Sequence, residues 1–231
     1  MLSSDKPAAP AMRTALAEPV IEEAMHATPD QRPVRALCVY CGASCGISPA
    51  YVAAARALGA ALVNNGIALV YGGGNVGLMG VIADQVMRLG GEVTGVIPRA
   101  LMEQEVGHRA LTRLHVVADM HERKAMMAQL ADGFIAMPGG MGTLEELFEI
   151  LTWSQLGLHD KPIGLLNVAG FYDGLIGFTG HLVAEGFLKP AHAGLLMHDA
   201  DPQTLLSRFA GFVPDRDSKI LNHALADDLL R

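Results

Sequence analysis

Two segments of the 231-residue chain place basic, acidic and glycine residues at spacings that suggest a reactive site. Residues 137–148 read MPGGMGTLEELF, so three glycines and a threonine precede Glu145 and Glu146 at an expected helix start. A carboxylate at the rim of a glycine turn is placed to act as a general base or to stabilise positive charge. Residues 119–130 read DMHERKAMMAQL, and Arg123 falls on the expected inward face of this helix. That face comprises Met120, Arg123, Met127 and Leu130.

Glu146 is the more informative of the two glutamates. The dipole of the helix favours carboxylates in its first turn and by itself explains Glu145. Glu146 points away from the main apolar stripe, which consists of Leu144, Leu147, Phe148 and Leu151. It points toward a second apolar face, which consists of Ile150, Trp153 and Leu156. A helix with two apolar faces is central or lies at a subunit interface, so this pattern predicts a homodimer.

Arg123 has two interpretations from the sequence alone. An arginine on an inward face needs an anion or a route to solvent. Because Arg123 and Glu146 follow what are expected to be neighbouring strands, both are expected to face one cleft. A structural ion pair is the alternative.

Three glycine-rich turns follow apolar segments of the chain. They are CGASCG at 41–46, YGGGNVGLMG at 71–80 and MPGGMGT at 137–143. Glycine lets a backbone approach a ligand closely, and the free N–H groups of a helix start bind anions. The turns therefore predict a site for a phosphate and a sugar, with the Thr143 hydroxyl as a cap or a phosphate ligand.

The second turn contains Gly72-x-Gly74-x-x-Gly77, which has the spacing of a dinucleotide-binding motif. That motif should follow the first strand, and an acidic residue should end the next strand. Here the turn follows the second strand, and the next strand ends in Ile97-Pro98-Arg99. An NAD site is therefore not expected.

The elements that must position these residues alternate between strand and helix. Strands are predicted at 36–40, 67–71, 92–97, 113–117, 133–137 and 162–167, with a short apolar segment at 194–197. Helices are predicted at 49–65, 78–89, 119–130, after 142, at 172–185 and at 202–209. This order predicts an α/β fold, a Rossmann-like doubly wound parallel sheet flanked by helices. Ligands of such folds bind at the carboxyl ends of the strands, where all three glycine turns fall.

Composition restricts the partners of the chain. A formal charge of −7 and a pI of about 5.7 argue against a nucleic-acid surface or an anionic membrane. No apolar run approaches the roughly 20 residues of a spanning helix, and no signal peptide is evident, so a cytoplasmic protein is expected. Residues 1–33 are expected to form a flexible N-terminal extension, with a short helix at 15–25, and residues 34–231 a single catalytic domain.

The cysteines do not predict a metal site or a disulfide. Cys38 and Cys41 have ligand spacing, but residues three apart on a strand point to opposite faces. No second cysteine pair accompanies them, although Cys45 follows closely. The segment HERKA also lacks the second histidine of an H-E-x-x-H motif.

The two motifs and several other segments resemble those of the LOG (Lonely Guy) family, whose members are cytokinin riboside 5′-monophosphate phosphoribohydrolases. PGGMGTLEE at 138–146 matches PGGxGTxxE, and Met120-x-x-Arg123-Lys124 matches the family's second motif. The similarity runs from about residue 34 to residue 212. It includes CGAS, the second-turn GGG, IPRALM at 97–102 and LTWSQLGLHDKPIGLLN at 151–167.

The resemblance implies hydrolysis of the N-glycosidic bond of N6-substituted AMP, without a cofactor or metal, by a homodimer. It implies that Arg123 and Glu146 are the essential pair. The implied substrate contacts are Ser44, Gly73, Gly74, Glu105, Lys124, Gly140, Met141, Gly142, Thr143, Leu144, Glu145 and Thr152. The first turn departs from the family pattern, with Ala43 where a second serine is expected.

Three other functions remain as alternatives. A lysine decarboxylase would need a lysine that forms a Schiff base with pyridoxal phosphate, and only Lys124 is expected near the site. A nucleotide or molybdenum-cofactor carrier would bind its ligand without cleaving it. A broader nucleoside 5′-monophosphate hydrolase differs from the leading interpretation only in pocket shape.

Overall fold

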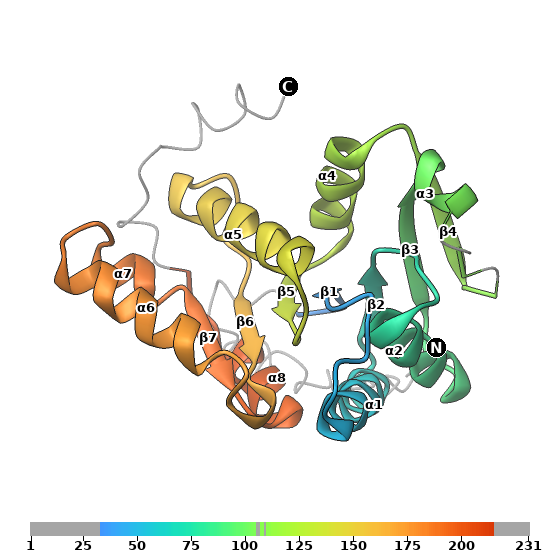
Figure 1. The fold of residues 1–231 in the computed structure, drawn as a ribbon, viewed down its shortest axis with the longest axis horizontal. Coiled ribbons are helices and arrows are strands. Elements are labelled where there is room, and N and C mark those ends of the chain that lie inside the picture. The colour runs from blue at the N-terminus through green and yellow to red at the C-terminus, as the bar shows by residue number, and fades with distance from the viewer. Residues whose placement is uncertain (1–32, 105–106, 109, 215–231) are drawn as a thin grey trace, which may run out of the picture. The chain divides into compact units, whose positions relative to one another are not determined.

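The computed structural model describes residues 33–104, 107–108 and 110–214 (Figure 1). A seven-stranded sheet lies at the centre, in the order β4-β3-β2-β1-β5-β6-β7. Every neighbouring pair of strands is parallel, which confirms the predicted doubly wound α/β fold. The strands are β1 Ala36–Tyr40, β2 Ala68–Tyr71, β3 Val93–Pro98, β4 Arg113–Val117, β5 Gly133–Ala136, β6 Ile163–Leu166 and β7 Leu196–Asp199.

Helices cover both faces of the sheet (Figure 1). They are α1 Pro49–Asn64, α2 Gly77–Arg88, α3 Arg99–Gln104, α4 Met120–Leu130, α5 Met141–Leu156, α6 Asp173–Ala184, α7 Pro190–Ala193 and α8 Pro202–Ala210, with a 3-10 turn η2 at Val168–Gly170. One core cluster joins one face of the sheet to α1, α2 and α8, and a second joins the other face to α4 and α5.

Most predicted elements are confirmed to within two residues at each end. The structure adds α3, α7 and η2, which the sequence pattern did not predict. These segments are three to six residues long, too short to show a helical period. The last strand lies at Leu196–Asp199, two residues later than predicted, because it is a half-exposed edge strand that ends with polar residues.

The prediction that Arg123 and Glu146 follow neighbouring strands is wrong. They follow β4 and β5, and β4 is an edge strand separated from β5 by β3, β2 and β1. The polypeptide returns from that edge through α4, which lies against all four of these strands from β4 to β1 and reaches α5. The two segments therefore meet because α4 crosses the sheet.

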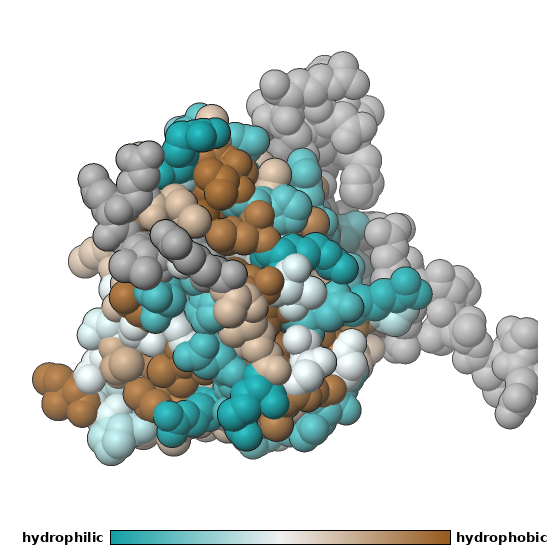
Figure 2. All heavy atoms as spheres, turned by 90° about the vertical axis from the view of Figure 1, so that its right-hand side faces the viewer, coloured by the Kyte–Doolittle hydropathy of each residue, from teal (hydrophilic) through white to brown (hydrophobic). Residues whose placement is uncertain are grey.

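The β4 edge carries a mixed surface. Arg113 on β4 pairs with Glu92 at 3.4 Å, and both side chains are exposed. Figure 2 looks onto this side, where hydrophilic and hydrophobic residues are interspersed. Charged side chains on an edge strand discourage pairing with other strands.

The two buried cysteines lie on opposite faces of the sheet. Cys38 belongs to the cluster under α4 and α5, and Cys41 to the cluster that includes α1 and α2. The predicted divergence of their side chains is thus confirmed. Burial raises the pKa of both thiols far above the usual value, which makes them poor nucleophiles.

Some predictions lie outside the described residues. Residues 1–32 of the predicted extension, with the helix at 15–25, belong to this group, as does Glu105. The division into an extension and one catalytic domain therefore stays a prediction. Among the helices that the structure describes, none is long and apolar enough to cross a membrane.

Candidate active site

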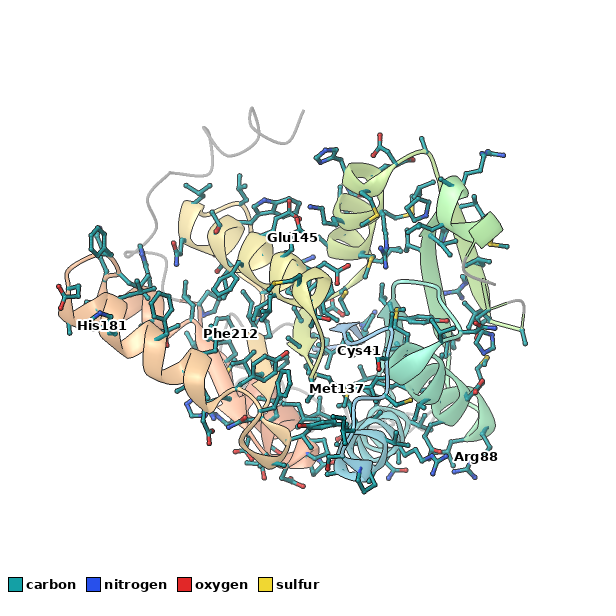
Figure 3. All side chains as sticks on the ribbon, viewed as in Figure 1. Cys41, Arg88, Met137, Glu145, His181 and Phe212 are labelled. Carbon is teal, nitrogen blue, oxygen red and sulfur yellow. The ribbon has the colours of Figure 1, made fainter. Side chains whose placement is uncertain are left out.

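The three glycine turns meet at the carboxyl ends of three adjacent strands, β2, β1 and β5. The first turn is tied to both of the others. The Gly42 N–H donates to the Pro138 carbonyl at 3.1 Å, and the Leu78 N–H donates to the Gly42 carbonyl at 3.0 Å. Figure 3 labels Cys41 and Met137, which begin the first and third turns.

Gly77 shows why this assembly needs glycine. Its φ is +59°, and a Cβ there would collide with the Ala43 backbone in the first turn. The first and second turns are thus in direct backbone contact, and a side chain at Gly77 would separate them.

The third turn leads into α5 with its first N–H groups uncapped. The N-cap residue is Gly140, which has no side chain to accept their hydrogen bonds. Thr143 is buried, and its hydroxyl lies against Gly139, where a Cβ would collide with it. Gly140, Met141 and Gly142 are exposed. The helix start is therefore open to an anion from solvent, with a hydroxyl beside it.

Arg123 on α4 and Glu146 on α5 face each other. The Arg123 Nη2 atom lies 3.9 Å from Glu146 Oε1, and each side chain is only 12% exposed. The guanidinium is held instead by the Gly72 carbonyl, which accepts from Nη2 at 3.3 Å, and by Met120 Sδ, 3.5 Å from Nη1.

Arg123 and Glu146 form an ion pair without a hydrogen bond between them. A separation of 3.9 Å is too long for a hydrogen bond. Among the residues that the structure describes, the buried Arg123 Nε atom has no hydrogen-bond partner. Buried polar groups are normally satisfied, so an arginine held in this way is typical of a functional site.

The carboxyl group of Glu146 has an unusual protonation equilibrium. Its pKa is raised to about 7, mainly by burial; Arg123 and Lys124 oppose the rise, and the carboxylates of Glu145 and Glu149 add to it. A carboxyl group with a pKa near neutrality exchanges protons readily at physiological pH, as a general base must.

Lys124, next to Arg123 on α4, is held between two carboxylates of α5. Its Nζ atom lies 2.6 Å from Glu145 Oε1 and 3.0 Å from Glu149 Oε1. Although burial favours the neutral amine, these two hydrogen bonds raise the pKa of Lys124. The prediction that the helix dipole alone explains Glu145 is therefore incomplete, because Glu145 also pairs with Lys124.

Three other predicted contacts, Ser44, Gly73 and Gly74, lie in the first and second glycine turns. The Ser44 hydroxyl is exposed and accepts from the Gly46 N–H at 3.2 Å. Gly73 has a φ of +78°, and Gly74 forms an antiparallel bridge with Gly107. These residues stay predicted contacts of a phosphate.

Leu144 and Thr152 lie on α5 itself. Leu144 is half-buried in the cluster beneath the helix. The Thr152 hydroxyl donates to the Phe148 carbonyl of its own helix at 2.7 Å. Thr152 lies six residues beyond Glu146, about 9 Å along the helix axis, so the structure does not place it beside Arg123 and Glu146.

The predicted inward stripe of α4 is partly wrong. Met127 is buried, but Met120 and Leu130 are each 40% exposed. The sequence analysis also missed the contacts of Arg123 with Met120 and Gly72, and the role of Glu149. Glu149 was detectable, because it follows Glu145 by four residues and so shares its helix face.

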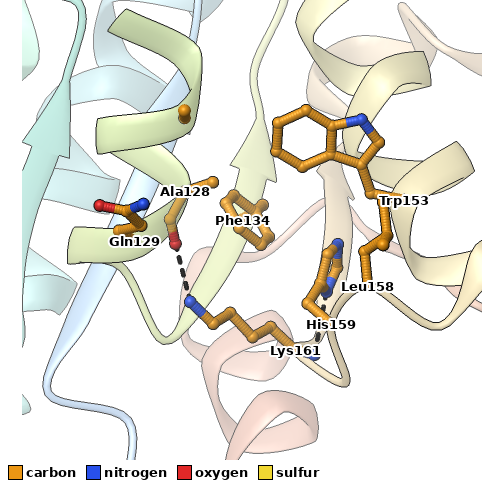
Figure 4. A pocket seen from close by; sticks show the side chains of 8 residues that line it. Ala128, Gln129, Phe134, Trp153, Leu158, His159 and Lys161 are labelled. Atoms are coloured by element: carbon orange, nitrogen blue, oxygen red, sulfur yellow. Dashed lines mark hydrogen bonds between the residues drawn. The ribbon is translucent and has the colours of Figure 1, made fainter. Parts of the chain in front are cut away.

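A small cavity lies further along α4 than Lys124. It has a volume of about 170 Å³ and lies between the second halves of α4 and α5 (Figure 4). Lys161 closes its floor and donates to the Ala128 carbonyl at 2.7 Å. Residues that line it are Ala125, Ala128, Gln129, Phe134, Trp153, Leu158, His159 and Lys161. The cavity is separate from the Arg123–Glu146 pair.

Comparison with known proteins identifies the family. A family model described as "Possible lysine decarboxylase" matches residues 79–209. The cytokinin riboside 5′-monophosphate phosphoribohydrolase LOG1 of Arabidopsis thaliana is 48% identical, over 77% of this chain and 84% of the relative. The chain belongs to the LOG family. A second relative is the cytokinin riboside 5′-monophosphate phosphoribohydrolase LOG of Oryza sativa subsp. japonica. It is 45% identical, over 84% of this chain and 83% of the relative.

Solved structures show the same fold at lower identity. The molybdenum cofactor binding protein of Rippkaea orientalis has a TM-score of 0.59 and 20% identity, over 77% of this LOG-family chain and 96% of its own. The molybdenum cofactor carrier protein of Chlamydomonas reinhardtii has a TM-score of 0.55 and 20% identity, over 75% of this chain and 95% of its own. At this identity the likeness concerns the fold alone.

Proposed function

We propose that this LOG-family protein hydrolyses the N-glycosidic bond of cytokinin riboside 5′-monophosphates, which are N6-substituted AMP. The products are the free base, which is the active cytokinin, and ribose 5-phosphate. The observation that carries the proposal is the Arg123–Glu146 pair beside three joined glycine turns, in a chain 45–48% identical to relatives named for this activity.

The 5′-phosphate fits the uncapped start of α5. Since the chain has a net charge of −7, an anionic substrate needs a local positive site. The N–H groups of residues 140–143 and the helix dipole supply one, with the Thr143 hydroxyl beside them. Binding energy from the phosphate then positions the sugar, although the phosphate does not react.

Glu146 is proposed to act at the ribose. As the C1′–N9 bond breaks, its electron pair leaves with the purine and positive charge develops on the sugar. The Glu146 carboxylate stabilises that charge and accepts a proton from the water whose oxygen bonds to C1′. The purine takes a proton from solvent. Arg123 favours the ionised form of Glu146 and orients it.

Lys124 does not fit the chemistry of a lysine decarboxylase. A Schiff base requires a neutral amine as nucleophile. Lys124 is instead paired with two carboxylates, which keep it protonated.

The experiment that tests the proposed function is base release from a panel of nucleotides. The panel contains N6-isopentenyl-AMP, AMP, the corresponding ribosides and the corresponding 5′-diphosphates, and the products are separated by chromatography. The proposal predicts base release from the monophosphates only, fastest from the N6-substituted one. Equal rates with AMP would indicate the broader hydrolase, and binding without release would indicate a carrier.

Substitution of Gly72 tests how Arg123 is positioned. A Cβ at Gly72 would collide with Arg123 Nη2, which is the free end of a flexible side chain. Gly72→Ala is therefore expected to fold but to displace the guanidinium, which lowers kcat for base release by about 100-fold. The control is Gly211→Ala at the end of α8, where the nearest atoms to a Cβ are carbonyl oxygens 3.8 and 3.9 Å away and activity should not change. Wild-type kcat in Gly72→Ala would contradict this placement of Arg123.

A homodimer and a cytoplasmic location remain part of the proposal. Trp153, on the face predicted to form the interface, is half-buried and lines the cavity within the chain.

Helix α6 buries none of its residues, although it is largely apolar, and Phe178 on it is 52% exposed. We therefore place the dimer interface at α6. Light scattering tests the dimer: Phe178→Asp should produce a monomer, and a monomeric wild-type protein would overturn the assignment.

A further inference from the structure

Two neighbouring residues of α4, Arg123 and Lys124, face glutamates of α5, and their distances to those glutamates differ. Arg123 and Glu146 are separated by 3.9 Å, beyond hydrogen-bond distance. The next residue on α4, Lys124, makes two contacts of 2.6 and 3.0 Å with Glu145 and Glu149. The direct link between the helices at this level is therefore Lys124, and it lies beside the proposed catalytic pair.

Glu149 is the better protected of the two carboxylates that hold Lys124. Its side chain is 26% exposed, whereas that of Glu145 is 52% exposed, and the Lys124 side chain is 11% exposed. Exposed ion pairs are screened and contribute little, while partly buried ones hold their geometry. Although the Glu145 contact is shorter, the Glu149 contact is the one shielded from solvent.

The position of Lys124 also determines which charges Glu146 experiences. Arg123 and Lys124 face it from α4, and Glu145 and Glu149 flank it on α5. The uncharged groups that interact with it from the end of β1 are Cys38, Tyr40 and Cys41. Burial is the main cause of the raised pKa of Glu146, and with Lys124 held in this position two cations oppose the effect of two carboxylates on it.

We propose that Glu149 is a positioning residue that holds the Lys124 ammonium against α5, and thereby sets the 3.9 Å separation of Arg123 and Glu146, the pair proposed to act at the N-glycosidic bond. Neither the family motif PGGxGTxxE nor the proposed mechanism includes this residue. The inference rests on the proposed function, since it concerns the same reaction. A glutamate three residues after Glu146 returns to the same side of the helix, which is why it can reach Lys124.

The test is the pH profile of kcat for Glu149→Gln with N6-isopentenyl-AMP as substrate. Glutamine keeps the size of the side chain but loses the charge. We expect kcat to fall by about 10-fold to 100-fold, because the catalytic pair is displaced, with a smaller change in KM. Loss of a neighbouring negative charge should also move the acid limb of the profile to lower pH. A wild-type kcat or an unmoved acid limb would overturn the proposal.

A second variant distinguishes positioning from a purely structural role. Lys124→Met removes a cation near Glu146 and leaves two carboxylates unpaired, so its acid limb should move to higher pH, opposite to that of Glu149→Gln. Shifts in the same direction would contradict the proposal. If Glu149→Gln does not fold, Glu149→Asp replaces it, and loss of kcat with unchanged thermal stability is then the expected result.

The matched control is Glu92→Gln. Glu92 is an exposed carboxylate that pairs with Arg113 at 3.4 Å, so the charge change is the same but distant from Glu146. Its profile should match that of the wild type. The wild-type protein is assayed first: if it releases no base from any nucleotide, the proposed function fails. If it releases base but Glu149→Gln matches it, only the role of Glu149 fails.

Discussion

Glu146→Gln is expected to lower kcat for base release by roughly 1,000-fold. Glutamine retains the shape of the side chain but can neither take the negative charge nor accept a proton from water. In the wild-type protein the rate should fall below pH 7, because burial raises the pKa of Glu146 to about 7 and the protonated form is inactive. The variant should lose this acid limb. A variant with wild-type kcat would rule out Glu146 as the acting carboxylate.

The same substitution is expected to stabilise the fold at alkaline pH. The pKa of Glu146 rises from 4.5 to about 7 on folding, so the protonated carboxyl is favoured in the folded state. Its contribution to stability is complete below pH 4.5 and is lost as pH rises through 7, by roughly 3 kcal/mol at pH 8. Glu146→Gln should therefore unfold at a higher denaturant concentration than the wild type at pH 8, and the difference should vanish near pH 4.5. Equal midpoints at pH 8 would contradict the burial of this charge.

Arg123→Met is the second substitution with a large expected effect. We expect kcat/KM for base release to fall by about 100-fold to 1,000-fold, because the preorganised cation is lost. Because Arg123 opposes the rise in the pKa of Glu146, its removal should move the acid limb of the pH profile to higher pH. The measurement is kcat/KM across pH 5 to 9, a range of about two pH units on either side of this pKa.

The fold should tolerate the loss of Arg123. Within the described part of the chain its guanidinium makes only two long contacts, with the Gly72 carbonyl at 3.3 Å and Met120 Sδ at 3.5 Å. Its Nε atom has no hydrogen-bond partner among the described residues, and no hydrogen bond joins it to Glu146. The melting temperature of Arg123→Met is therefore expected to stay within about 3 °C of that of the wild type. A small change is typical of a residue that serves function and not stability. Arg88→Met, at an exposed arginine on α2, is the matched control and should keep full activity. Unchanged kcat/KM in Arg123→Met would indicate the structural ion pair.

The strands and the turns could be predicted well because each depends on the residue types within a short segment of the sequence. Buried parallel strands appear as short apolar runs, as at Ala36–Tyr40, and the turns between strands and helices appear as glycine clusters. The glycine turns could be assigned to one edge of the sheet because all parallel strands end on the same side.

The order of the strands was not predictable from these local patterns. Alternation of strand and helix specifies a parallel sheet, but which strands pair depends on tertiary packing. Hence the chain positions of Arg123 and Glu146 suggested neighbouring strands, whereas α4 in fact crosses from β4 to α5. The contacts of Lys124 with Glu145 and Glu149 were missed for the same reason, since they join residues 21 and 25 positions apart.

Product analysis of the wild-type protein with N6-isopentenyl-AMP tests the central claim most directly. Free base and ribose 5-phosphate are quantified over one time course, for the wild type and for Glu146→Gln. The account predicts that the wild type releases both products in equal amounts and that the variant releases neither above background. A nucleotide that stays intact, or one that loses its phosphate while the base remains attached to the ribose, would contradict it.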